Sequence, residues 1–190
     1  WGPQPQPHRS RTAVVGKNVA VWNVPTLSSH MDPSSRFATG DDAPAVLDLY
    51  REAVGEQAAL RPMWPLADGL AEPADIAVSD ILGDPGSRLA VGEIDGVVVG
   101  FAWARSEPLL PQAGGAPVCV VRLVYTTPEA RGVGVGDSML TLLMDDFAGR
   151  GHRHFDARVS PGHRNAKNFF EAHGFSARLI VMYHDAGEGP

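Results

Sequence analysis

A short glycine-rich segment carries the clearest chemical signal in this sequence. It runs from Arg131 to Gly136, reads RGVGVG, and lies between an apolar stretch and a stretch with helical periodicity. Glycine leaves backbone N–H groups open to an anion, and the first N–H groups of a helix have no partner within the helix. The helix dipole adds a positive partial charge there, and Arg131 can add a charged donor. We therefore expect a binding site for a phosphate-bearing cofactor.

The residues on either side of this segment predict the elements that position it. Cys119 to Tyr125 is an apolar run rich in β-branched residues, which is typical of a buried strand. From about Val135 onward, the apolar positions recur at helical spacing, and they are Met139, Leu140, Leu143, Met144 and Phe147. We expect a strand, a loop and a helix in this order, so that the glycines lie at the helix N-terminus.

Three kinds of glycine-rich phosphate loop can be compared with this segment. A dinucleotide fingerprint requires G-x-G-x-x-G, but its last position falls on Asp137 or Met139, depending on the starting glycine. A Walker loop requires Gly-Lys-Ser/Thr, and the segment has no lysine. The third kind, R-x-x-G-x-G, matches directly after a turn at residues 127–130. A tight turn that binds nothing is the alternative.

This third match resembles the acetyl-CoA pyrophosphate loop of the GNAT family of N-acetyltransferases. A second segment, His163 to Phe175, resembles the family's N-x-x-A-x-x-x-Y-x-x-x-G-F, and Arg36 to Thr39 followed by Asp41-Asp42-Ala43 is a weaker third match. The resemblance covers roughly residues 35–184. It implies an α+β, three-layer fold with a mixed, mostly antiparallel sheet flanked by helices. The sheet would be splayed between its fourth strand, Val118 to Thr126, and its fifth, Phe155 to Val159.

The resemblance also implies a function. Such a protein moves an acetyl group from acetyl-CoA, its acyl-donor substrate, to a primary amine by direct attack in a ternary complex, without a metal. The backbone at Val124 and Thr126 would pair with the pantetheine amides, and the N–H near Val124 would stabilise the oxyanion. The implied cofactor-binding residues are Val124, Tyr125, Thr126, Arg131, Gly132, Val133, Gly134, Val135, Gly136, Asp137 and Phe170.

Three positions depart from the family pattern. Phe170 stands where a tyrosine often protonates the departing thiolate, His163 replaces an asparagine, and Arg122 occupies a position where some members carry a glutamate base. A thiol of pKa about 8.5 can leave without an acid, whereas an alkylamine of pKa about 10.4 needs a base.

The residues that could remove the amine's proton are Glu107, beside the predicted splay, and Glu93, Tyr125 and His184. The catalytic candidates are thus Val124, Glu107 and Tyr125. The three departures also leave open a second function, an acyl-CoA-binding or sensing module with a degenerate site and no transferase activity.

Length and charge bound the function further. The 190 residues suit one domain. Residues 31–121 hold 14 acidic against 5 basic side chains, whereas residues 122–190 hold 8 of each. This division fits a polyanionic cofactor on the C-terminal half and a cationic small-molecule or peptide amine on the other, although solvated surface charge is an equally simple reading. Nucleic acid requires a basic face and is not expected as a partner.

The remaining features concern location and the chain's beginning. No apolar run reaches the ~20 residues that a membrane span needs, so no membrane partner is expected. The single cysteine, Cys119, predicts a small core residue and a reducing, cytoplasmic compartment. Residues 1–30 read as an N-terminal tail that resembles a vector-derived tag, with a hairpin expected at Val14 to Trp22, and residues 31–190 read as the domain. A homodimer is a possible further partner.

The same patterns predict the other elements. His152, His154 and Asp156 alternate along the predicted fifth strand, but they lack further ligands for a metal. The other expected helices are one capped by Asp41 and Asp42, with Val46, Leu47, Tyr50 and Val54 on one face, and two more at Ala74 to Leu82 and Arg164 to His173. The other expected strands are Arg36 to Thr39, a hairpin of Leu89 to Glu93 and Val97 to Arg105 about Asp95-Gly96, and a final strand near Arg178 to His184.

Overall fold

The structure is a computed structural model that describes residues 32–60, 69–109, 114–160 and 162–181. The expected hairpin at Val14 to Trp22 and the end of the expected final strand, residues 182–184, lie outside these ranges. The described elements are β1 (Pro33–Phe37), η1 (Gly40–Asp42), α1 (Ala43–Leu60), α2 (Ala74–Gly83), β2 (Ser87–Ile94), β3 (Val97–Pro108), β4 (Pro117–Thr126), η3 (Pro128–Ala130), α3 (Val135–Gly149), β5 (His154–Ala157) and α4 (Arg164–Ala172).

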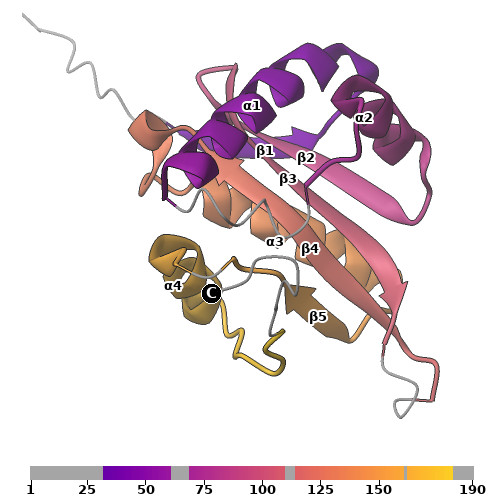
Figure 1. Ribbon diagram of the computed structural model, residues 1–190. Coiled ribbons are helices and arrows are strands. Elements are labelled where there is room, and N and C mark those ends of the chain that lie inside the picture. The colour runs from indigo at the N-terminus through magenta and orange to yellow at the C-terminus, as the bar shows by residue number, and fades with distance from the viewer. Residues whose placement is uncertain (1–31, 61–68, 110–113, 161, 182–190) are drawn as a thin grey trace, which may run out of the picture. The chain divides into compact units, whose positions relative to one another are not determined.

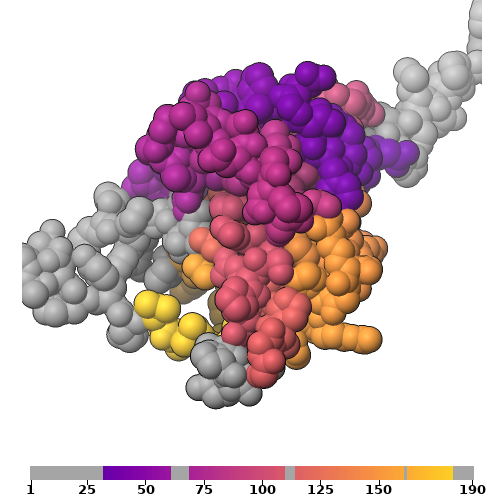
Figure 2. Space-filling model, turned by 90° about the vertical axis from the view of Figure 1, so that its right-hand side faces the viewer, coloured from indigo at the N-terminus to yellow at the C-terminus, as the bar shows by residue number. Residues whose placement is uncertain are grey.

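The strands form one mixed sheet in the order β1-β2-β3-β4-β5. Strands β1 to β4 pair with one another antiparallel, and β5 pairs parallel to β4. Helices α1 and α2 cover one face of this sheet and α3 covers the other (Figure 1). The side view in Figure 2 shows the purple layer of α1 and α2 and the orange α3 on either side of the strands. The expected three-layer α+β architecture is confirmed.

Each face of the sheet has its own apolar core. On one face, α3 contributes Met139, Leu140, Leu143 and Phe147, each 0% exposed, and these pack on β3 and β4. On the other face, Val46 and Leu49 of α1 pack with Phe101 of β3. Full burial of one such side chain contributes about 1.5–3 kcal/mol. The helical spacing read from the sequence therefore identified the buried face of α3.

The β2–β3 turn agrees with its sequence signal. Asp95 and Gly96 both have positive φ, 51° and 78°. This is the backbone of a two-residue hairpin turn whose twist matches that of the flanking strands, and it favours Asp-Gly.

The first strand ends two residues earlier than expected. β1 ends at Phe37 rather than at Thr39. The backbone N–H of Thr39 donates to Oδ2 of Asp42 at 2.7 Å, which begins the turn before α1 instead of continuing the strand. Arg36 then holds the same carboxylate with both terminal nitrogens at 2.8 Å.

The expected final strand is wrong over its described part. Residues 178–181 have no strand structure, and Leu179, Ile180 and Val181 are 70%, 78% and 81% exposed. No apolar face is buried there, so nothing in this segment selects a register in the sheet. The segment is instead linked to β5 by Arg178, whose Nε donates to Oδ1 of Asp156 at 2.7 Å.

Candidate functional site

The β4–β5 ladder covers only the first half of β4. Pairing runs from Val118 opposite His154 to Val121 opposite Ala157, and the Arg158 N–H donates to the Val121 carbonyl at 3.3 Å. β4 continues to Thr126 with β3 as its only described neighbour. The sheet is thus splayed where the sequence predicted, and one edge of β4 is open over its last residues.

A bulge in β4 sets the direction of the side chains in the splay. In the pairing with β3, Trp103 lies opposite Leu123 and Ala104 opposite Val121, so Arg122 is the extra residue. Val121 packs in the α3-side core, whereas Leu123 packs on the α1 side. The bulge therefore shifts the alternation by one residue, and it directs Tyr125 toward α1.

The direction of the backbone N–H groups along the end of β4 also alternates from residue to residue. The N–H of Thr127 donates to Val99 of β3 at 2.9 Å. Successive residues of a strand direct their backbone groups to opposite edges, so Tyr125 also faces β3, and Val124 and Thr126 face the splay. The two residues expected to pair with a bound pantetheine arm thus direct their N–H groups to the open edge.

The glycine loop directly follows this strand and begins α3. Gly132 and Gly134 have φ of 78° and 98°, a region that side chains disfavour. Gly134 is the N-cap, no side chain caps the helix, and the first bond is Ser138 N–H to the Gly134 carbonyl at 2.9 Å. Among the described residues no acceptor satisfies the N–H groups of residues 135–137. They form the anion-attracting helix end that the sequence predicted.

Arg131 turns away from these N–H groups. Its Nη1 and Nη2 donate to the two carboxylate oxygens of Glu56 on α1, at 2.9 and 2.6 Å, and its Nε donates to the Thr126 carbonyl at 2.9 Å. The guanidinium lies 5.5 Å from the centroid of the Tyr125 ring. Hydrogen bonding from Arg131 lowers the pKa of Glu56. In this structure Arg131 joins α1 to the loop.

Tyr125 faces two carboxylates of α1. Its side chain is buried, and its phenol oxygen lies 3.5 Å from Oε2 of Glu52. Burial, followed by the negative charges of Glu56 and Glu52, raises the pKa of Tyr125. The phenol therefore keeps its proton at neutral pH, which suits a hydrogen-bond donor better than a base.

Glu107 lies away from the open edge, which corrects the position expected from the sequence. On β3 it is opposite Val118, about 20 Å of extended strand from Val124. Its Oε1 accepts a hydrogen bond from Arg122 Nη1, and its Oε2 lies 3.4 Å from Arg158 Nη2.

The other candidate bases lie elsewhere. Glu93, on β2, accepts a hydrogen bond from Arg36 Nε at 2.9 Å, and His184 lies outside the described residues. Cys119 is 0% exposed, and burial raises its pKa to about 12. A thiol with such a pKa is protonated at neutral pH, so Cys119 is a core residue and not a nucleophile.

Phe169, and not Phe170 as expected from the sequence, is the aromatic residue of α4 that lies near the glycine loop. Phe170 is 6% exposed and lies in the α3-side core, with its ring 5.3 Å from that of Phe175. Phe169 is the residue that approaches the glycine loop, since a Cβ at Gly136 would lie 3.3 Å from its ring. Because the two phenylalanines are adjacent, the sequence alone does not say which one faces the loop.

The remaining loop residues contribute backbone and charge. Val135 is fully buried against β2, where Gly92 leaves room for it, and Val133 is partly buried. Asp137, in the first turn of α3, lies 3.1 Å from Nε2 of His173. A bound phosphate would thus meet the N–H groups of these residues rather than their side chains.

The described residues contain no group of three or more His, Cys, Asp or Glu that could hold a metal ion. His152 precedes β5 and is used within the fold, where its Nε2 lies 2.8 Å from the Ser106 hydroxyl. Within the described part of the chain, no helix combines the length and the apolar character that crossing a membrane requires.

The geometry agrees with a comparison against known families. A sequence model of the Acetyltransferase (GNAT) family matches residues 45–175. The chain belongs to this family. Its match begins in α1 and ends just after α4, so it includes the open edge of β4 and the glycine loop of this GNAT domain.

Solved structures show the same fold at low sequence identity. A transcriptional regulator from Bacillus halodurans C-125 is 20% identical with a TM-score of 0.66, and the alignment covers 81% of this chain and 99% of that one. The aminoglycoside acetyltransferase AAC(6')-Iy, in complex with a CoA-S-monomethyl-acetylneamine bisubstrate analogue, is 18% identical with a TM-score of 0.61, covering 81% and 98%. A ribosomal-protein-alanine N-acetyltransferase from Brucella melitensis biovar Abortus 2308 is 16% identical with a TM-score of 0.60, covering 81% and 99%. No curated protein matches the chain.

Two residues of this GNAT domain were missed in the sequence. Glu52 and Glu56 belong to the helical pattern of α1 and lie 73 and 75 residues before their partners, Tyr125 and Arg131. The only signal that could have indicated them was the excess of acidic residues in this half of the chain. Their proximity to β4 follows from packing of α1 on the sheet, which no local pattern encodes.

Proposed function

We propose that the protein is an acetyl-CoA-dependent N-acetyltransferase that transfers an acetyl group to a primary amine within a ternary complex. The observation that carries this proposal is the open edge of β4 continuing directly into an uncapped helix N-terminus. The edge offers N–H groups at Val124 and Thr126 for an extended amide chain, and the helix end offers N–H groups for a pyrophosphate. We assign the domain to residues 31–190.

The chemistry we assign to this site is direct aminolysis of a thioester. The lone pair of the neutral amine attacks the carbonyl carbon, a C–N bond forms, and negative charge develops on the carbonyl oxygen. The Val124 N–H at the open edge would hold that oxygen. The C–S bond then breaks, and the proton lost by the nitrogen is taken up by the departing thiolate, through the solvent or through the Tyr125 phenol. We assign the cofactor contacts to the residues expected from the sequence, with Phe169 in place of Phe170.

The acceptor class is open at this level. The structural neighbours are named for aminoglycosides and for a ribosomal-protein alanine, which are chemically different amines. The acidic side chains of α1 near Tyr125, Glu52 and Glu56, support an acceptor that is cationic. Cytoplasmic location and homodimer formation stay predictions from the sequence.

The test combines binding with turnover. A ligand at about 100 times its Kd adds about 2.7 kcal/mol of stability, so acetyl-CoA is expected to raise the melting temperature by several degrees, whereas ATP and NAD are not. Thiol release is then measured with polyamines, aminoglycosides, amino acids and peptides. Absence of stabilisation by any acyl-CoA would refute the cofactor site.

A binding or sensing module is the second candidate. Phe170, buried in the core, stands where members of the family often have a tyrosine that protonates the departing thiolate. Tight acetyl-CoA binding without thiol release across the whole amine panel would favour this module. Steady turnover with any amine of the panel would exclude it.

A further inference from the structure

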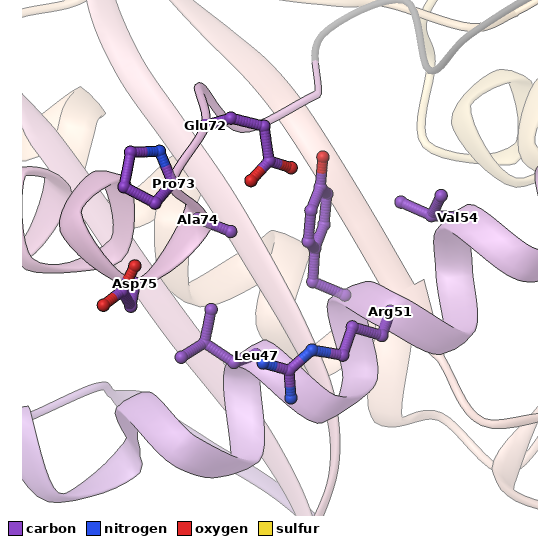
Figure 3. A pocket seen from close by; sticks show the side chains of 8 residues that line it. Leu47, Arg51, Val54, Glu72, Pro73, Ala74 and Asp75 are labelled. Atoms are coloured by element: carbon purple, nitrogen blue, oxygen red, sulfur yellow. The ribbon is translucent and has the colours of Figure 1, made fainter.

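The pocket between α1 and the start of α2 does not belong to the cofactor site. It has a volume of about 450 Å³, and its described wall consists of residues of α1 and of the segment that begins α2, among them Val54, Glu72 and Asp75 (Figure 3). No described residue of this wall comes from β4, the glycine loop or α4. The contacts that bear on a bound cofactor lie instead where the end of α4 meets the beginning of α3.

His173, at the end of α4, places both of its ring nitrogens beside oxygen acceptors. Its Nδ1 lies 2.8 Å from the Phe169 carbonyl oxygen, and its Nε2 lies 3.1 Å from Oδ1 of Asp137. A carbonyl and an ionised carboxylate only accept hydrogen bonds, and a neutral imidazole has a single N–H to donate. Only the protonated ring can donate to both oxygens, so this geometry suits a charged His173 paired with Asp137.

The surroundings of His173 direct its charge toward the glycine loop. Its side chain is 24% exposed, and its ring lies 4.7 Å from that of Phe169, the residue that approaches this loop. Within the described ranges, Asp137 is the only charged side chain in hydrogen-bond or ion-pair contact with His173. Lys167 and Glu171, the charged residues nearest to it along α4, pair with each other. The first turn of α3 therefore receives the charge of His173.

Asp137 stands where its own carboxylate could cap the helix. With Gly134 as the N-cap, it is the third residue of α3, a position from which an acidic side chain can turn back to the N-cap N–H. Asp42 does this in the turn before α1, where it accepts the Thr39 N–H at 2.7 Å. In α3 no side chain of the described residues caps the helix, and the Asp137 carboxylate lies beside His173 instead.

We propose that His173 is a positioning residue of the cofactor site, which holds the Asp137 carboxylate off the helix N-terminus and so keeps that end open for the pyrophosphate of an acyl-CoA. This inference rests on the cofactor site of the proposed function and not on the transfer step. When His173 loses its proton, Asp137 loses a donor, and its negative charge can then occupy the free N–H groups and repel a phosphate. The affinity for acetyl-CoA should therefore fall as the pH rises through the range in which histidine changes charge, about pH 5 to 8.

The experiment is a calorimetric titration with acetyl-CoA at several pH values between about 5 and 8. We expect the wild-type Kd to be about fivefold lower at the acidic end, the ratio that one unit charge about 4 Å away produces in water. His173→Leu should bind at the weaker level throughout, and Asp137→Asn at the tighter level throughout. A phosphate monoester also changes charge near about pH 6, so the wild-type response is compared with that of the variants. His154→Leu, at an exposed position of β5, is the matched control and should keep the wild-type profile.

The outcomes distinguish this inference from the proposed function. A wild-type pH profile that persists in His173→Leu or in Asp137→Asn would overturn the role of His173 and leave the cofactor site intact. Loss of the profile in both variants would support it, even where no amine releases thiol. If no acyl-CoA binds at any pH, the proposed function fails, and inorganic pyrophosphate becomes the probe. Tighter binding of pyrophosphate to the wild type than to His173→Leu at the acidic end would support the inference, and equal or absent binding would overturn it.

Discussion

At the scale of single residues, the neighbours of Tyr125 and Glu107 indicate different parts in proton transfer. Tyr125 is buried beside the carboxylates of Glu52 and Glu56, and this environment keeps its phenol protonated. Glu107 has the opposite environment, because arginine side chains already donate to its carboxylate. Along the strand Glu107 is also about 20 Å from Val124, too far to reach an amine at the open edge. We therefore expect Tyr125 to influence turnover directly and Glu107 to act on the fold around Arg122.

This difference can be measured with two isosteric changes. Tyr125→Phe should lower kcat by about tenfold and leave the KM for acetyl-CoA unchanged. This is less than the roughly 10²–10⁴-fold typical for loss of a general acid or base, because a thiolate is a good leaving group. Glu107→Gln should leave kcat nearly unchanged while lowering the melting temperature. Steady-state kinetics between pH 6 and about 9 make the comparison. A large loss of kcat in Glu107→Gln with a shifted pH profile would instead restore Glu107 as the base.

At the scale of elements, the site depends on β4, the glycine loop and α3 as one continuous unit. The splay leaves backbone groups of β4 without a strand partner, the bulge at Arg122 turns Tyr125 toward α1, and Gly134 begins the helix in a left-handed conformation. None of these features needs a particular side chain at the cofactor. These backbone features are therefore present although Phe170, His163 and Arg122 depart from the pattern expected from the resemblance.

The sequence could predict the parts of this unit that local chemistry determines. The turn at Asp95-Gly96, the loop glycines and the buried stripe of α3 each have a local signal, and all three are confirmed in backbone or packing. The bulge has no local signal. Residues 118–121 are all apolar, so the sequence does not show which of them face each side of the sheet. The Arg131–Glu56 contact joins residues 75 positions apart and arises only from packing of α1 on the sheet.

Three glycine substitutions test the element that holds the loop. Gly134→Ala should destabilise the fold by about 1–2 kcal/mol and weaken acetyl-CoA binding at least tenfold, because φ is 98° and the new Cβ would lie 3.3 Å from Pro33. Gly132→Ala has a φ of 78° but open space, so only the conformational strain should remain. Gly55→Ala, in α1 with nothing near its Cβ, should stabilise the protein by about 0.5–1 kcal/mol.

Urea unfolding and calorimetric titration with acetyl-CoA give the two quantities for each variant. Gly55→Ala is the control for the cofactor, since it changes stability without touching the loop. Wild-type acetyl-CoA affinity in Gly134→Ala would show that the left-handed N-cap does not shape the binding site, and the loop assignment would have to be abandoned.

At the scale of the whole molecule, acidic side chains are in excess in the first part of the domain and are balanced by basic ones in the second. This division parallels the opposite charges of the proposed acceptor and donor. Residues 31–121 carry 14 acidic against 5 basic side chains, and they include α1, whose Glu52 and Glu56 reach Tyr125 and Arg131. Residues 122–190 balance 8 against 8 and include the glycine loop and α3, where a polyanion would bind. A cationic acceptor and an anionic donor would thus be drawn to different parts of one domain, and each would meet the potential that favours it.

Ionic strength should reveal this division. Raising the salt from 0.01 M to 0.15 M shortens the Debye length from about 30 to about 8 Å, which removes the long-range attraction but affects contacts at the helix N-terminus much less. The KM for a polyamine acceptor such as spermidine should therefore rise several-fold, that for a singly charged alkylamine less, and that for acetyl-CoA least. Potassium chloride and sodium chloride should act alike, because the effect is screening. Equal responses of the two amines would mean that the acidic half of the chain serves solubility and does not attract the acceptor.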